Sequence, residues 1–369
     1  MKTKILLTAI VSSFILHPSA FAQGALTPPG APAPTMKTLA QIEPRTPISS
    51  LPYTISSSGS YYLTTNLVNT NTAGGFNGIT IASGVNDVTL DLNGFTLADA
   101  VTNAVFQYGI NAPGNNTNLV VRNGTLRNWT TTGIGFYGVN GGKIENVTCI
   151  GIGTTGNGAG IEVGSRFQVV NCQGINSVSG FAANTVDNSF NHCVASFCSQ
   201  IGFSISSSNT TLVDCQAHDN AGYGFYFFTP ASRSSFLNCS ANNNGVVGFD
   251  ITSTNTVIQG CSAKNNQTGI IVTSSCEVLN NECANNSSQG FYIGGNGNRV
   301  DGNSSINGVF GTGFYVISTG NFIVRNTSRG GAVAFSIPAG NSSGPVVDVY
   351  NAGNGTNNIT SSAWANFSY

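Results

Sequence analysis

A short pattern of polar and apolar residues repeats along most of the chain. Each copy is a glycine followed by an apolar residue, a variable residue and a second apolar residue, as in GFSI at Gly202 and GFYV at Gly313. The apolar residues alternate with period two, which is typical of a strand that buries one side. Helical spacing is not sustained anywhere in the repeat, so the pattern predicts strands. The copies begin at Gly78, Gly133, Gly160, Gly202, Gly224, Gly248, Gly269, Gly290 and Gly313, with weaker copies at Gly109, Gly180 and Ala334.

The spacing of these copies is nearly constant. From Gly160 onward the steps are 20, 22, 22, 24, 21, 21, 23 and 21 residues, and a period of this size is typical of a stacked repeat. Leucine-rich repeats have a comparable period, but their leucine-rich consensus is absent here. Short strands separated by Asn and Gly turns, at about 22 residues per coil, predict an all-β fold, a parallel β-helix with three strands per coil. A rod of about 12 coils, each rising by roughly 4.8 Å, would be about 55 Å long.

Five of the nine cysteines recur with the period of the repeat, at steps of 21, 22, 24 and 22 residues. They are Cys172, Cys193, Cys215, Cys239 and Cys261. Residues one coil apart stack directly, so we expect a column of buried free thiols, because buried Cys behaves as a small apolar residue. Disulfides and a metal site are the alternatives, but the cysteine count is odd and no CxxC pair indicates zinc. The other four fall outside this column: Cys149, Cys198, Cys276 and Cys283.

The amino-terminal part of the chain differs from the repeat. Residues 1–22 have two early lysines, an apolar run and small residues before the expected cleavage point, which is typical of a secretory signal peptide. Residues 23–45 are rich in proline and predict an extended linker. The β-helix is therefore expected over residues 46–369. Because a solenoid exposes open strand edges at its ends, we expect residues 46–67 and 347–369 to act as caps.

Charge excludes several kinds of partner. Charged residues make up 7% of the chain, with 13 basic and 14 acidic residues and a net charge of −1. Nucleic-acid binding normally needs a basic stripe, and attachment to an anionic membrane needs a polybasic segment; neither is present.

After the signal peptide, no apolar run is long enough to span a bilayer. The sequence therefore predicts an exported protein, secreted or at the cell surface.

Several segments resemble a known family. The phrases VTLDLNGFTL from Val88 and VRNGTLRNW from Val121, the opening PRTPISSLPYTISSSGSYYLTTNL and the close AWANFSY resemble secreted bacterial right-handed parallel β-helix proteins of the pectin-lyase-like superfamily. The resemblance covers roughly residues 46–369. It implies the right-handed β-helix fold. It implies less about activity, because this superfamily contains lyases, hydrolases, epimerases and proteins without known activity.

The resemblance also implies which catalytic residues to look for. The lyases of the superfamily use Asp-bound Ca²⁺ with a basic residue, and the polygalacturonases use three Asp, two of them adjacent, with a nearby His. This sequence has no adjacent Asp pair, and its acidic residues after Glu162 are isolated. Neither set can be carried over, so the catalytic residues are unknown and no metal or cofactor is expected. The pair His218–Asp219 could act as acid and base. However, Asn242–Asn243 stands at the same place one coil later, which favours a turn.

The variable residue of each copy indicates a candidate binding surface, because it points away from the core. Down the coils this residue is Glu162, Ala182, Ser204, Tyr226, Asp250, Ile271, Tyr292 and Tyr315. Exposed aromatic rings stack on the apolar faces of sugars and carry a polar group. The alternative is that Tyr simply favours strands. The candidate glycan-binding residues are Tyr226, Phe228, Asp250, Tyr292 and Tyr315.

The sequence therefore favours a protein that binds extracellular polysaccharide without an identifiable catalytic motif. A polysaccharide lyase or glycoside hydrolase of the same superfamily and a structural or adhesive rod are the alternatives. Whether the protein is an enzyme, which glycan it binds and its oligomeric state are left open by the sequence.

Overall fold

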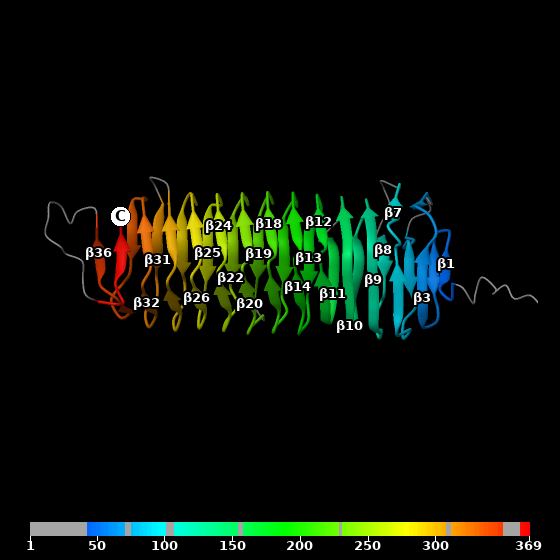
Figure 1. The fold of residues 1–369 in the computed structure, drawn as a ribbon, viewed down its shortest axis with the longest axis horizontal. Coiled ribbons are helices and arrows are strands. Elements are labelled where there is room, and N and C mark those ends of the chain that lie inside the picture. Colours follow the sequence, from blue (N-terminus) through cyan, green and yellow to red (C-terminus); the bar gives the residue numbers. More distant parts are fainter. Residues whose placement is uncertain are drawn as a thin grey trace, which may run out of the picture. The chain divides into compact units, whose positions relative to one another are not determined.

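The repeats fold as the successive coils of a parallel β-helix, and each coil supplies strands to three faces (Figure 1). The computed structural model describes residues 43–70, 75–100, 107–153, 158–228, 231–307, 311–349 and 362–369. Arg45–Tyr369 forms one unit of about 12 turns, consistent with the predicted fold class. The predicted signal peptide and most of the predicted linker lie outside the described residues. In the described part, no helix is long and apolar enough to cross a membrane.

Face 1 carries the glycine pattern, and its strands pair in parallel from one coil to the next. It contains β2 (Tyr53–Ile55), β5 (Ile79–Ile81), β8 (Tyr108–Asn111), β13 (Ser179–Ala183), β16 (Ile201–Ile205), β19 (Tyr223–Phe227), β22 (Val247–Ile251), β25 (Thr268–Val272), β28 (Gln289–Ile293), β31 (Thr312–Val316) and β34 (Val333–Ser336).

Face 2 follows in each coil. It contains β1 (Thr46–Ile48), β3 (Gly59–Leu63), β6 (Val88–Asp91), β14 (Ser189–Asn191), β17 (Thr211–Val213), β20 (Ser235–Leu237), β23 (Val257–Gln259), β26 (Glu277–Leu279), β29 (Arg299–Asp301), β32 (Phe322–Val324) and β35 (Ser342–Ser343).

Face 3 completes the coil. It contains β4 (Leu67–Asn69), β7 (Thr96–Asp99), β12 (Gln173–Ile175), β15 (Val194–Ser196), β18 (Gln216–His218), β21 (Ser240–Asn242), β24 (Ser262–Lys264), β27 (Glu282–Ala284), β30 (Ser304–Ile306), β33 (Thr327–Arg329), β36 (Val346–Asp348) and β37 (Asn366–Ser368). Three long strands run across corners: β9 (Thr117–Arg127) on faces 2 and 3, β10 (Thr132–Ile150) on all three, and β11 (Ala159–Val170) on faces 1 and 2.

The core consists of side chains stacked in columns, because residues one coil apart are in register. On face 1, Phe181, Phe203, Phe225 and Phe249 are fully buried. Their rings stack in parallel at centroid distances of 4.7, 4.8 and 4.6 Å, about one strand spacing. Such stacking buries each large ring against its two neighbours, which stabilises the coil and its register together.

The glycine of each copy is required by close packing. A Cβ atom at Gly248 would lie 2.7 Å from the carbonyl oxygen of Gly269 and 3.0 Å from the Cβ of Ala263. A real Cβ does not approach backbone so closely, so only glycine fits. Ala334 departs from the pattern on β34, which pairs only with β31 among the described strands. No described strand follows it on face 1, so its Cβ has no next coil to meet.

The corners between faces are built from left-handed residues. Asp219, Asn243 and Asn265 follow one another along one corner with φ of 57°, 55° and 56°, as their predicted turn role requires. Each is followed by a buried Asn, and the amide of Asn244 donates to Asn266 Oδ1 at 3.1 Å. These inward amides satisfy backbone groups that the bend removes from the sheet ladder.

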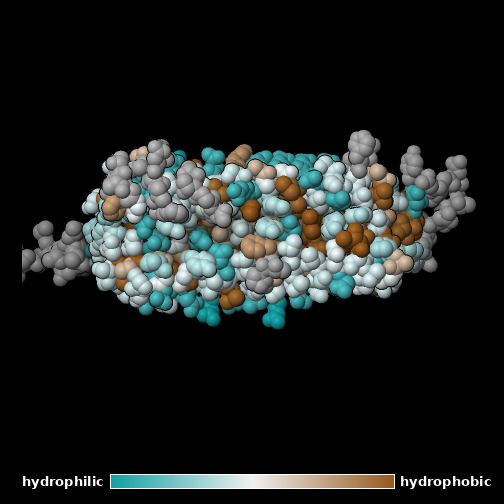
Figure 2. Space-filling view, turned by 180° about the vertical axis from the view of Figure 1, so that it is seen from behind, coloured by the Kyte–Doolittle hydropathy of each residue, from teal (hydrophilic) through white to brown (hydrophobic). Residues whose placement is uncertain are grey.

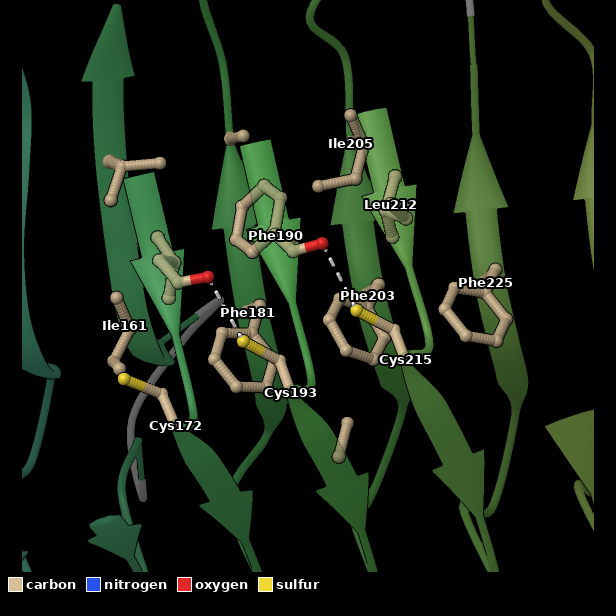
Figure 3. Close-up of a cluster of buried hydrophobic side chains, with 14 of the residues drawn as sticks. Ile161, Cys172, Phe181, Phe190, Cys193, Phe203, Ile205, Leu212, Cys215 and Phe225 are labelled. Carbon is tan, nitrogen blue, oxygen red and sulfur yellow. Dashed lines mark hydrogen bonds between the residues drawn. The ribbon is translucent and has the colours of Figure 1, made fainter. Parts of the chain in front are cut away.

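The five-cysteine column lies at another corner, and all five thiols are buried and unbonded to sulfur. Each thiol donates to a carbonyl of the preceding coil: Cys193 to Val169 at 3.4 Å and Cys215 to Phe190 at 3.4 Å (Figure 3). After Cys261 the same column continues as buried Asn281, Asn303, Asn326 and Asn366. The cysteines are therefore part of one hydrogen-bonded corner ladder, and Cys and Asn fill equivalent places in it.

The remaining cysteines occupy other columns. Cys198 and Cys276 stand in the ladders of the other two corners, where their backbone amides donate to Asn220 and Asn298 at 2.9 and 2.8 Å. Cys149 and Cys283 point inward from face 3, and Cys283 pairs with Ala263 in register. Small side chains in this column leave room for the glycines of face 1.

The two ends are formed by strands of the coil itself. Residues 46–67 supply β1 and β3 and the start of β4, and β1 is the outermost described strand on face 2. At the other end, β37 lies between β33 and β36. The last described residues of the chain thus return to complete face 3. Whether these segments prevent aggregation stays a prediction.

Candidate functional site

The variable residues of the repeat lie in one row along face 1. Strand register places Ser204 beside Tyr226, Tyr226 beside Asp250, and Tyr292 beside Tyr315. Ile271 links Asp250 to Tyr292 in the same register. The candidate glycan-binding residues of this row are thus brought together in space in the order that the repeat predicted. Their role in binding is a separate question.

Aromatic rings form two groups along this row, one at Tyr226 and one at its carboxy-terminal end. Tyr226 stacks on Phe228 at a centroid distance of 5.1 Å and on Tyr223 at 4.9 Å, and Tyr292 and Tyr315 are tilted at 5.7 Å. All five rings are partly exposed. Face 1 therefore presents two groups of rings to solvent. Figure 2 shows a side of the molecule that is mostly pale or hydrophilic, with strongly hydrophobic residues gathered toward its carboxy-terminal half.

Asp250 is buried, which corrects the expectation that it faces solvent with the tyrosines. Its exposed fraction is 9%, and its Oδ1 has no hydrogen-bond partner among the described residues. The longer side chains of Tyr226 and Ile271 flank it in register and shield the short aspartate. Burial raises the pKa of Asp250 to about 6. Asp250 therefore borders the aromatic row rather than offering a fully exposed carboxylate.

A hollow of about 350 Å³ lies at the other end of the row. Its lining includes Tyr108, Asn111 and Glu162, and the exposed ring of Tyr137 stands at it. Gly135 lies between Asn111 and Glu162 in register, and a Cβ there would meet the Tyr108 ring at 2.6 Å. Because Gly135 has no side chain, the Tyr108 ring can lie across the strand that contains Gly135. The shape of the hollow therefore depends on this glycine.

Glu162 is the acidic group of this hollow. Its Oε1 accepts a hydrogen bond from the amide of Asn184 at 2.8 Å. Burial raises the pKa of Glu162, and the Asn184 bond opposes that rise. Burial, together with the charge of Glu162, also raises the pKa of Tyr108. The hollow thus combines one carboxyl, amide groups and two tyrosine rings.

Sequence reasoning missed Tyr108 and Tyr223 as site residues, although a signal was present. Each is the residue immediately before the glycine of its copy. Tyr223 stacks on Tyr226 and Tyr108 lines the hollow, so this position also contributes side chains to the outer surface of face 1. Glu162 was placed in the row by its register but was not singled out.

The pair His218–Asp219 has the contacts of a turn. His218 Nδ1 and Asp219 Oδ2 are 2.8 Å apart, and the hydrogen bond from His218 holds the pKa of Asp219 below its usual range. Asp219 also accepts from Asn243 at 3.2 Å, which continues the corner ladder. Within the described ranges, no group of three or more His, Cys, Asp or Glu side chains could hold a metal ion.

Comparisons with known proteins agree with the fold. A family model described as right handed beta helix region matches residues 164–305. The mannuronan C-5 epimerase A-modules of AlgE6 and AlgE4 from Azotobacter vinelandii superpose with TM-scores of 0.59 and 0.58, at 14% and 15% identity. These alignments cover 80% and 77% of this chain and 87% and 90% of the epimerase chains. The Dettilon tailspike protein superposes with a TM-score of 0.53 at 14% identity, over 76% of this chain and 58% of its own.

A search of curated protein sequences found no match to this chain. At identities this low, the solved structures establish the fold alone. The protein is a right-handed parallel β-helix, as its resemblance to secreted proteins of the pectin-lyase-like superfamily implied. Export itself is a prediction from residues outside the described ranges.

Proposed function

We propose that this protein is exported and binds a polysaccharide along face 1 without cleaving it. The observation that carries the proposal is a row of partly exposed rings. Tyr226, Tyr292 and Tyr315 lie in register from coil to coil along face 1, and Phe228 stacks on Tyr226. Tyr226 and Tyr315 are four coil steps apart, roughly 19 Å by strand spacing, which suits a short oligosaccharide. Tyrosine rings offer sugars an apolar surface with a hydroxyl at its edge.

The position of the carboxylates favours binding over hydrolysis. Glu162 and Asp250 are the two acidic residues of the row and are separated by four register steps, roughly 19 Å. Glycoside hydrolysis by a carboxylate pair needs a separation of about 5 to 10 Å. This pair is too far apart for that mechanism. The solved structures with this fold include proteins named as polysaccharide epimerases, which is compatible with a polysaccharide partner.

The test is a glycan array followed by affinity measurement on each polymer that binds. The double variant Tyr292→Ala and Tyr315→Ala should weaken binding by about tenfold or more, because each stacking ring contributes about 0.5–1.5 kcal/mol. Phe197→Asn is the matched control. It removes an aromatic ring that is 58% exposed and has a φ of 55°, at the corner between faces 3 and 1 and outside the row of variable residues.

Two results would contradict the proposal. Unchanged affinity in the double tyrosine variant, with its melting temperature retained, would mean that the rings are only sheet packing. If instead the wild type cleaves a polymer and Asp250→Asn abolishes that turnover, the protein is an enzyme. Product analysis by mass spectrometry on every bound polymer separates these outcomes.

A further inference from the structure

The charges on the molecule are distributed unevenly among its faces. In the ranges that the structure describes, the parts of the strands that lie on face 1 contain no lysine, arginine or histidine, although they contain Glu162 and Asp250. Lys143 belongs to the long strand β10 but lies in its face 2 part. Several basic side chains on faces 2 and 3 pair with acidic residues there: Arg122 with Asp91, Lys264 with Glu282, and Arg299 with Asp301. Arg166 and Arg233 lie at the corner between faces 1 and 2; Arg166 contacts Asp187 at 3.7 Å, and Arg233 is exposed. Face 1 therefore offers negative charge and no cation from its strands.

This distribution bears on which sugars face 1 could hold. A uronate polymer carries one carboxylate per residue, and protein sites for carboxylates normally supply Arg or Lys. On face 1 it would meet two carboxyls instead. Both already have raised pKa values because of burial, so their charged forms are poorly solvated and a second anion nearby would be costly. An uncharged sugar has no such penalty, since its hydroxyls can donate to carboxyl and amide oxygens.

We propose, building on the polysaccharide-binding function above, that face 1 selects uncharged polysaccharide and that the Tyr108–Glu162 hollow holds one neutral sugar residue. The hollow supplies what a sugar ring needs. Glu162 keeps acceptor capacity beyond its bond from Asn184, Asn111 can donate and accept, and the rings of Tyr108 and Tyr137 provide apolar surface. Its volume of about 350 Å³ is at the lower end of ligand pockets, consistent with one or two sugar units.

The experiment compares pairs of polymers with the same glycosidic linkage, in which the C6 group of the sugar is either neutral or a carboxylate. Oligosaccharides of β-1,4-mannan and of mannuronan form one pair, and methyl-esterified polygalacturonate and polygalacturonate form another. Affinity for each is measured by calorimetry at low and moderate salt, with the full-length protein. The wild type should bind a neutral member at least about tenfold more tightly than its charged partner. Added salt should reduce this difference in affinity, because it screens the repulsion between the uronate carboxylates and the carboxylates of face 1.

Two variants test the hollow itself. Glu162→Gln keeps the shape and the acceptor for Asn184 but removes the charge, so it should strengthen uronate binding about threefold or more and change neutral binding less. Tyr108→Ala should weaken neutral binding about fivefold or more. Melting temperatures confirm that both variants fold, and Glu162→Gln remains informative if Tyr108→Ala does not.

The outcomes separate this inference from the function it depends on. Tight wild-type binding of a uronate polymer, weakened by salt, would overturn charge selection while leaving polysaccharide binding intact. Suppose that binding of the neutral polymer is unchanged in Glu162→Gln and Tyr108→Ala but is lost in the Tyr292 and Tyr315 double variant. The proposal that the hollow holds a sugar residue would then be wrong. Failure to bind any polymer would count against the proposed function and this inference together.

Discussion

At the scale of the residue, exposure on face 1 depends on the size of the neighbours one coil away. Asp250 has the same place in its repeat as Tyr292, yet it is buried between Tyr226 and Ile271. A short side chain between two long ones loses contact with solvent, which raises the free energy of its charged form. The pKa of about 6 at this aspartate is therefore a consequence of how the coils stack. It makes the stability of the protein depend on pH through a residue of the surface row.

We expect Asp250→Asn to be more stable than the wild type at neutral pH. An Asp pKa raised from 3.8 to about 6 means that the folded protein binds more protons than the unfolded chain between these values. The free energy of unfolding of the wild type should therefore fall as pH rises from about 4 to 6. The variant lacks this loss. It should gain about 1–2 kcal/mol at pH 7.5 and almost nothing at pH 4.

Chemical unfolding of both proteins at pH 4, 5, 6 and 7.5 checks this expectation. Asp301→Asn serves as a control of opposite sign, because Arg325 and Arg299 hold the pKa of Asp301 below its usual range. That variant should be less stable than the wild type at neutral pH. A gain in Asp250→Asn that is equal at every pH would disprove the link to ionisation.

At the scale of the element, each strand is short and its ends are held by the corner ladders. Asn303 shows the pattern: its Oδ1 accepts from the backbone N–H of Asn281 at 2.9 Å, and its amide donates to Val278 at 2.8 Å and Asn326 at 3.0 Å. The side-chain amide of Asn281 also donates to Asn303 Oδ1 at 3.0 Å, so four buried polar groups depend on this one side chain. A cysteine in the equivalent place, Cys215, makes weaker sulfur contacts at 3.4 Å.

Asn303→Ala should therefore destabilise the protein more than Cys215→Ala. The asparagine variant leaves a buried N–H and a buried carbonyl without partners, which costs about 3 kcal/mol or more. The cysteine variant removes a small apolar group and weak hydrogen bonds, at about 1–2 kcal/mol. Thermal unfolding of both variants under reducing conditions gives the comparison. Equal losses would mean that Cys and Asn contribute to the ladder in the same way.

At the scale of the whole molecule, the last strand closes the stack. β37 pairs with β33 on one side and β36 on the other, and Asn366 ends the corner ladder by accepting from the N–H of Asn326 at 3.0 Å. Without this segment, β33 would expose an open edge in a protein made almost entirely of parallel strands. Open edges of this kind template pairing between molecules.

Deletion of residues 347–369 should therefore produce soluble aggregates or inclusion bodies. Size-exclusion chromatography with light scattering measures the result. The full-length variant Asn366→Ala is the control: it loses the ladder contact but keeps the strand, so it should stay unaggregated and unfold at lower temperature. A truncated protein that is monomeric and as heat-stable as the full chain would show that the tail is no cap.

The sequence by itself determined the strand type, the coil period and the register of Tyr226, Asp250, Tyr292 and Tyr315. These follow from local chemistry: alternation defines the buried side, and a glycine that tolerates no Cβ marks the same point in every coil. The left-handed corners at Asp219 and Asn243 were also predictable, because few residues adopt that backbone conformation.

Only the tertiary structure decided what each stacked position contacts. It placed Cys198 and Cys276 in other ladders, because loop lengths at the corners set their register. It buried Asp250 through the size of its neighbours. It brought the Tyr108 ring to the hollow beside Glu162, because Gly135, which stands in register between Asn111 and Glu162, has no side chain to fill that space. Exposure and side-chain proximity depend on three consecutive coils at once, and a pattern read one coil at a time does not contain that information.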